Sequence, residues 1–390
     1  MAPYAHHPIR SGAILALVAL TLLAPGAAAQ AGGTLPTPTP VTPQGQPSGT
    51  AFDGNGMWIW ELARSSGGDP DRIAQVASTH GVSTIYVKSS DGSRYWSQFS
   101  PAFVGAMHAR GLKVCAWPYV YGNSPRAEAR VSARAVTAGA DCLVIDAEAE
   151  YEGKYTSAGT YVRKLRAYVG QDYPVGLAGF PYVDYHPAFP YSVFLGPGGA
   201  QYNVPQMYWR AIGTTVDQVY AHTYAWNALY GRPVFPLGQL WMSPPPAEVV
   251  RFRQLAVAYG ATGVSWWSWQ SAGAKALGAL ATPLQTLAGT APAAPVLPTL
   301  ARGARGDTVV WAQQHLRAAK FKVKASGYYG GDTKTAVRRF QAARALPVTG
   351  AIDGPTWDAL LVARPAAARW DHAPRSADLP ARRRELPPKP

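Results

Sequence analysis

The chain is poor in cysteine, histidine and charge. Its 390 residues include two cysteines and eight histidines, and only 15% of the residues are charged. Neither cysteine lies in a Cys or His spacing typical of zinc, so we expect no metal site and no cofactor. The low charge, together with 13 Trp, 21 Tyr and 10 Phe, excludes a long disordered chain or a coiled coil, because so many rings require a large packed core.

Long apolar runs are also scarce. The one marked run, residues 13–23, follows Arg10 and precedes a triplet of alanines at residues 27–29. It is too short to span a bilayer, and the pattern is that of a secretory signal peptide over residues 1–30. We therefore expect a mature chain without an integral membrane span, secreted or held at the cell wall or in the periplasm. An uncleaved membrane anchor is the alternative.

Cys115 and Cys142 each fall within a predicted buried strand. An oxidising compartment permits a disulfide between them. Free cysteine is also among the most buried residue types, where it packs as a small apolar side chain, and we expect this second state.

Stretches rich in proline divide the chain. Residues 31–50 and 286–298 are predicted linkers, and residues 364–390 a disordered basic tail. They separate a body, residues 51–285, from a module, residues 299–363.

Short apolar or aromatic runs recur through the body about every 30 residues. They begin near Met57, Thr84, Lys113, Cys142, Val175, Asn203, Val234 and Gly263. The segments between them have the N-cap, proline and glycine signals of helices. This alternation predicts an α/β fold, a (β/α)8 TIM barrel, followed by a small all-α C-terminal domain. An open doubly wound sheet is the alternative, although no G-x-G-x-x-G follows a strand.

The net charge of +14 is unevenly distributed. The body has 18 basic against 15 acidic residues, the module has ten against four, and the tail has seven against three. Because no recognition motif or basic helix stripe is present, we expect no nucleic acid as a partner. An anionic wall surface suits the module better, with a merely solubilising charge as the alternative.

Carboxylates cluster at the end of the fourth predicted strand, and in a (β/α)8 barrel such strand ends form the active site. Asp146 and Glu148 project to one side, and Glu150 is the next residue in this register. Repulsion between them should raise the pKa of at least one, as a general acid requires. We predict a catalytic pair that cleaves a glycosidic bond. The alternative is a structural ion pair with Lys88.

Aromatic and amide side chains at the strand ends suit sugar rings and N-acetyl groups. The predicted substrate-binding residues are Glu150, Lys88, Gln206, Tyr208, Trp267, Trp269 and Glu61. For each tryptophan, core packing is the alternative, because alternate residues of a barrel strand point outward.

Residues 85–92, 111–114 and 145–148 are similar to the lysozymes of glycoside hydrolase family 25, and the resemblance covers residues 55–275. It implies a muramidase barrel in which Glu148 is the general acid and Asp146 orients or stabilises the reacting N-acetyl group. That family usually has an Asp at the end of strand one, where this chain has Glu61.

The same strand resembles that of family 18 chitinases. Asp141, Asp146 and Glu148 match three of the acids in Asp-x-x-Asp-x-Asp-x-Glu, and Val144 stands where the fourth is expected. Both resemblances imply a polysaccharide that contains N-acetylhexosamine.

The module resembles the small three-helix peptidoglycan-binding domain found on many wall hydrolases. The matching pairs include Gly306-Asp307, Gln313-Gln314, Phe340-Gln341 and Thr356-Trp357. We expect Phe340 and Trp357 to lie in the core.

These features together predict a monomeric, exported cell-wall glycan hydrolase, lysozyme-like or muramidase-like, which the module holds on peptidoglycan or a related N-acetylated polysaccharide. The alternatives are a chitinase-like hydrolase and a catalytically inactive barrel that binds the wall.

Overall fold

The computed structural model describes residues 49–285, 287 and 292–366. The predicted signal peptide, most of the first linker, part of the second and the tail beyond residue 366 lie outside the described residues. Within these limits, no helix combines the length and apolar character needed to cross a membrane.

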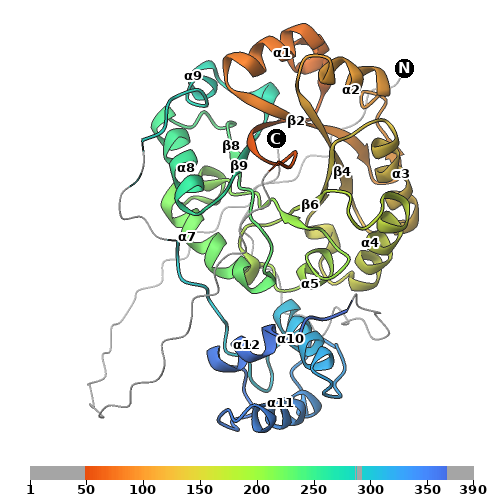
Figure 1. Cartoon of the computed structure of the whole chain (residues 1–390), viewed down its shortest axis with the longest axis vertical. Helices are drawn as coiled ribbons and strands as arrows, with labels where there is room; N and C mark the ends of the chain where they lie inside the picture. Colours follow the sequence, from red (N-terminus) through yellow and green to blue (C-terminus); the bar gives the residue numbers. More distant parts are fainter. Residues whose placement is uncertain (1–48, 286, 288–291, 367–390) are drawn as a thin grey trace, which may run out of the picture. The chain divides into compact units, whose positions relative to one another are not determined.

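Eight parallel strands form the sheet of the body (Figure 1). They are β1 (Gly54–Ile59), β2 (Val82–Asp91), β4 (Lys113–Val120), β5 (Cys142–Ala147), β6 (Val175–Ala178), β7 (Tyr202–Asn203), β8 (Leu237–Gln239) and β9 (Gly263–Trp267). Their order is β7-β6-β5-β4-β2-β1-β9-β8, with β3 (Arg94–Tyr95) antiparallel to β2. Isolated parallel bridges join Asn203 to Val234 and Gln206 to Leu237, so the edge strands meet and the barrel closes. The predicted barrel is confirmed.

Helices surround the strands (Figure 1). They are α1 (Pro70–Thr79), α2 (Pro101–His108), α3 (Pro125–Thr137), α4 (Tyr155–Val169), α5 (Tyr191–Phe194), α6 (Trp209–Ile212), α7 (Val216–Asn227), α8 (Pro246–Ala258) and α9 (Ala274–Gly278). Asp69 and Ser100 cap α1 and α2 as their sequence pattern predicts. Ser124 makes no such side-chain bond, and the Glu128 carboxylate accepts from its backbone N–H at 3.0 Å.

Side chains of the barrel strands alternate between the interior and the helix layer. Rings from several strands form one buried interior cluster, among them Trp58, Tyr86, Trp117, Tyr208 and Trp267. Their chain neighbours, such as Ile59, Ile85 and Trp266, are buried against the helices. Most tryptophans of the strands therefore pack in one of these two cores.

Cys115 and Cys142 form a disulfide, and our expectation of free thiols is wrong. The two residues are direct partners in the register of β4 and β5, with their Cα atoms 4.6 Å apart. Both face the barrel interior, so their side chains meet within bridging distance. A cysteine in a buried strand can be a free thiol or part of a disulfide, and burial alone does not distinguish the two. The register of β4 and β5 does.

The module contains α10 (Asp307–Ala318), α11 (Gly331–Ala343) and α12 (Gly354–Leu361). Phe340 and Trp357 are fully buried, as predicted. Two buried glutamines fix the turns between the helices. The Gln313 carboxamide oxygen accepts from the backbone of Gly327 at 3.0 Å, and that of Gln341 accepts from Gly350 at 2.9 Å.

Asp307, the first residue of α10, is buried against the barrel. Its carboxylate accepts hydrogen bonds from the Ser192 backbone at 2.8 Å, the Ser192 hydroxyl at 2.7 Å and the Tyr230 hydroxyl at 2.7 Å. The Trp311 indole donates to the Leu229 carbonyl at 3.0 Å. Burial raises the pKa of Asp307 to about 6, although the hydrogen bonds from Ser192 and Tyr230 favour its charged form.

Candidate active site

Asp146 and Glu148 come together at the end of β5. Asp146 is fully buried within the strand, and Glu148 follows it in the same register. The Gln206 amide nitrogen donates to Asp146 Oδ1 at 3.1 Å and to Glu148 Oε1 at 2.9 Å. Because an amide nitrogen carries two hydrogens, one side chain serves both carboxylates. Three of the predicted residues therefore form one hydrogen-bonded group.

Tyr208 contributes a hydroxyl beside this group. The side chain is buried, and its hydroxyl has no hydrogen-bond partner among the described residues. Burial raises the pKa of Tyr208, and the charges of Asp146 and Glu148 raise it further. The phenol therefore stays protonated and can donate a hydrogen bond to a ligand.

Glu150 joins the cluster through Tyr119. It lies beyond the strand in the 3-10 helix η3 (Ala149–Tyr151), and its Oε2 accepts from the Tyr119 hydroxyl at 2.9 Å. Burial raises the pKa of Tyr119, and the charges of Glu148, Asp146 and Glu150 add to the effect. All three carboxylates thus raise the pKa of the same hydroxyl, that of Tyr119, at the barrel mouth.

Lys88 is buried among aromatic rings. Its ammonium lies 3.3 Å from Asp91 Oδ2 and 4.6 Å from the centre of the Trp96 ring. The rings of Trp60 and Trp117 are also within cation–π distance. Lys88 thus forms an ion pair with Asp91. The Asp91 carboxylate also accepts from the Tyr121 hydroxyl at 2.7 Å.

The predicted tryptophans have different environments. Trp267 belongs to the interior cluster, 5.4 Å from Trp117 between ring centres, and its peptide bond to Ser268 is cis. Trp269 packs in the outer core and donates to the Ser66 hydroxyl at 3.2 Å. The half-buried Trp60 and Trp241 pack against the interior cluster, and sequence reasoning did not select them as binding residues.

Glu61 stands apart from the carboxylate pair. It precedes the 3-10 helix η1 (Leu62–Arg64), and its side chain, 39% exposed, forms an ion pair with Arg64 at 3.6 Å. Asp141 lies immediately before β5, at the opposite end of the strand from Glu148, and accepts from the Val114 backbone at 2.6 Å. Neither acid joins the group around Gln206.

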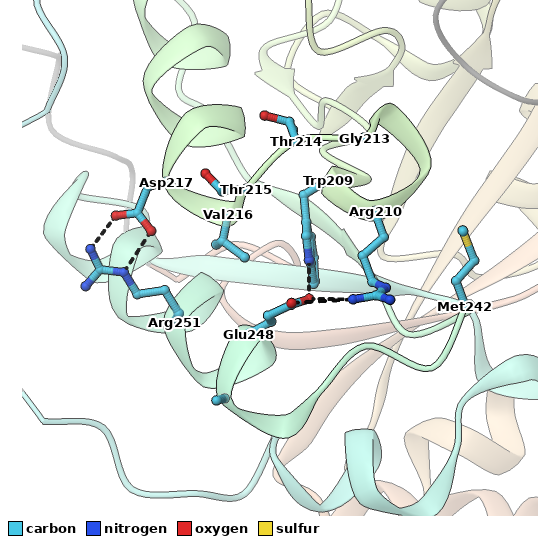
Figure 2. A pocket seen from close by; sticks show the side chains of 11 residues that line it. Trp209, Arg210, Gly213, Thr214, Thr215, Val216, Asp217, Met242, Glu248 and Arg251 are labelled. Carbon is cyan, nitrogen blue, oxygen red and sulfur yellow. Dashed lines mark hydrogen bonds and ion pairs between the residues drawn. The ribbon is translucent and has the colours of Figure 1, made fainter.

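An open cavity of about 480 Å³ is lined by residues of α6, α7 and α8 (Figure 2). Figure 2 shows Glu248 accepting from the Trp209 indole, at 2.7 Å, and pairing with Arg210, at 3.3 Å. Arg251 pairs with Asp217. No predicted site residue is among those that line this cavity.

Across the described parts of the chain, no group of His, Cys, Asp and Glu side chains could hold a metal ion.

Residues 305–360 match the family described as "Putative peptidoglycan binding domain", which confirms the resemblance of the module. No curated protein matches the chain.

Among solved structures, the chain is similar to a class V chitinase from Pseudomonas fluorescens, with 9% identity and a TM-score of 0.46 over 58% of this chain and 98% of that one. A chitinase from Chromobacterium violaceum gives 11% identity and a TM-score of 0.42, over 58% and 98% of the two chains. An endo-1,4-beta-D-mannanase from Thermotoga petrophila gives 10% and 0.43, over 56% and 88%.

Proposed function

We propose that the chain is an exported cell-wall hydrolase that cleaves an N-acetylhexosamine polysaccharide, with the module retaining it on peptidoglycan. The observation that carries the proposal is the Gln206 amide bonded to both Asp146 and Glu148 in an interior lined by aromatic rings. Two fixed carboxylates are the minimum equipment for hydrolysing a glycosidic bond. The peptidoglycan-binding match of residues 305–360 supports wall glycan as the substrate class.

In the proposed reaction, Glu148 gives its proton to the glycosidic oxygen as the bond from that oxygen to C1 breaks. The carbonyl oxygen of the substrate's 2-acetamido group attacks C1 and stabilises the positive charge there. Asp146 accepts from the acetamido N–H, and the Tyr208 hydroxyl donates to the acetamido oxygen. Water then attacks C1, the bond from C1 to the acetamido oxygen breaks, and Glu148 takes a proton from the attacking water, which regenerates the acid.

The placement of Glu61 supports assistance by the substrate. A carboxylate nucleophile from the first strand would have to reach C1 opposite the acid, but Glu61 pairs with Arg64. The acetamido group of an N-acetylated sugar supplies an oxygen in its place. A chitinase-like hydrolase would share this chemistry, and the module favours peptidoglycan over chitin.

The test is the release of reducing ends from purified peptidoglycan. We expect Glu148→Gln to lower the rate by at least about a hundredfold, because it removes the acid while keeping the shape of the side chain. The matched control is Glu61→Gln, which we expect to retain activity. Equal release by wild type and Glu148→Gln would remove Glu148 from the mechanism. Loss of activity in Glu61→Gln would instead indicate that Glu61 serves as the first-strand acid that the lysozyme resemblance implies. Mass spectrometry of the products separates a muramidase from a glucosaminidase by the sugar at the reducing end.

The second candidate is a non-catalytic wall-binding protein. The observation in its favour is the first strand, whose acid is not joined to the pair. This candidate predicts that the wild type pellets with cell walls and releases no reducing ends.

A further inference from the structure

The module carries a hollow of about 540 Å³ at the C-terminal ends of its three helices. Ala318 is the last residue of α10, Arg344 follows α11, and Val362 follows α12. Residues around the hollow include Ala318, Lys320, Arg344, Ala359, Val362 and Ala363. The hollow lies outside the barrel site.

The lining differs from that of the barrel mouth. Among the described residues that line the hollow there is neither an aromatic ring nor a carboxylate, the two groups that surround Glu148. Alanine methyl groups form much of the surface, and Lys320 and Arg344 are exposed beside them. A sugar ring would find no stacking partner here. Small apolar side chains and carboxylates would find complementary groups.

The helix ends add partial charge to the hollow. Three helix C-termini border the hollow, and most carbonyl groups of their last turns already accept from the backbone that follows, as those of Arg317, Gln341 and Leu360 do. Their partial negative charge favours nearby cations, which Lys320 and Arg344 supply. The hollow thus offers small apolar side chains as a contact surface and cationic donors for carboxylates. A short acidic peptide has both complementary groups.

We propose that this hollow binds the carboxylate-bearing peptide stems of peptidoglycan. Small stem side chains lie on the alanines, and stem carboxylates pair with Lys320 and Arg344. The inference rests on the proposed wall function and extends it, since the barrel then acts on the glycan while the module binds the peptide. The chain's own tail, residues 364–390, has seven basic and three acidic residues, so its charge is wrong for this hollow.

The test uses the full chain with Glu148→Gln, so that no turnover occurs. Calorimetry measures the affinity for the soluble tetrapeptide L-Ala-γ-D-Glu-meso-diaminopimelate-D-Ala, and an N-acetylglucosamine tetramer serves as the peptide-free probe. We expect Lys320→Ala with Arg344→Ala to weaken tetrapeptide binding at least tenfold. The matched control, Lys322→Ala with Lys324→Ala, removes the same charge from exposed positions of the module and should stay within twofold. Exchanging the two cations, Lys320→Arg with Arg344→Lys, should preserve binding.

Several results would overturn the proposal. They are failure of the tetrapeptide to bind the full chain, equal loss of affinity in both double alanine variants, and displacement of the peptide by the glycan tetramer. The first would exclude a peptide ligand, the second would indicate a diffuse charge effect, and the third would assign the hollow to glycan. Catalysis does not enter the measurement, so an inactive barrel would refute the proposed hydrolase and leave this result intact.

Discussion

Raising the pH from 4 to 7 should weaken the folded state through Asp307. This carboxyl is buried and accepts from Ser192 and Tyr230, and burial raises its pKa from the ordinary 3.8 to about 6. Between these two values the folded chain holds a proton that the unfolded chain has released. The contribution to stability is therefore complete below the unfolded pKa and is lost as the pH rises through about 6.

The magnitude follows from the shift in pKa. A shift of about two units corresponds to about 3 kcal/mol, of which about 2 kcal/mol is lost between pH 4 and pH 7. Other carboxyl groups titrate in the same range, so the wild type alone cannot isolate the effect. Asp307→Asn keeps an oxygen that can accept from Ser192 but has no titrating proton, which makes it the matched reference.

The assay is guanidinium unfolding of both proteins at pH 4, 5, 6 and 7, followed by circular dichroism. We expect the free energy of unfolding of the wild type, relative to Asp307→Asn, to fall by about 2 kcal/mol across the series. Most of this change should occur below pH 6. Parallel pH profiles for the two proteins, or a wild type that gains on the variant as the pH rises, would refute the assignment of the raised pKa to Asp307.

Three further predictions concern the site and its scaffold. Gln206→Leu removes both hydrogen bonds to the carboxylate pair and should lower kcat on wall glycan about a hundredfold, without changing wall pelleting. Glu128→Ala leaves the backbone N–H groups of Gly122, Asn123 and Ser124 without their carboxylate acceptor, and should lower the free energy of unfolding by about 3 kcal/mol in urea titrations. Replacing Cys115 and Cys142 by alanine opens a 27-residue cross-link and should cost about 3 to 4 kcal/mol in the same titrations, whereas unchanged stability would contradict the disulfide.

The strands were predictable because their spacing is a local property. Apolar runs recur at the interval that one strand and one helix require, and Asp-Pro and Ser-Pro pairs mark where α1, α2 and α3 begin. The period of two along β5 likewise placed Asp146 and Glu148 on one side. Each inference uses a short window of sequence and needs no knowledge of which strands are neighbours.

The contacts between strands were not predictable in the same way. Gln206 reaches the pair only because the segment after β7 closes the barrel against Leu237. Cys115 and Cys142 meet only because they are partners in the register of β4 and β5. Register is set by the packing of the whole barrel, so two cysteines in two predicted strands leave both redox states open.

Glu61 shows where a period of two stops being informative. In β5 the acids themselves show which side of the strand faces the interior, because a carboxylate buried against the helices would have no solvent and no partner. The segment Met57-Trp58-Ile59-Trp60 is apolar at every position, because both faces of a barrel strand are buried. Its pattern therefore does not show which alternate residues face the barrel interior. The structure turns Trp58 into the interior and Ile59 into the helix layer, so Glu61 falls in the phase of Ile59 and meets Arg64. A strand that is apolar on both faces therefore does not show which side an acid at its end faces.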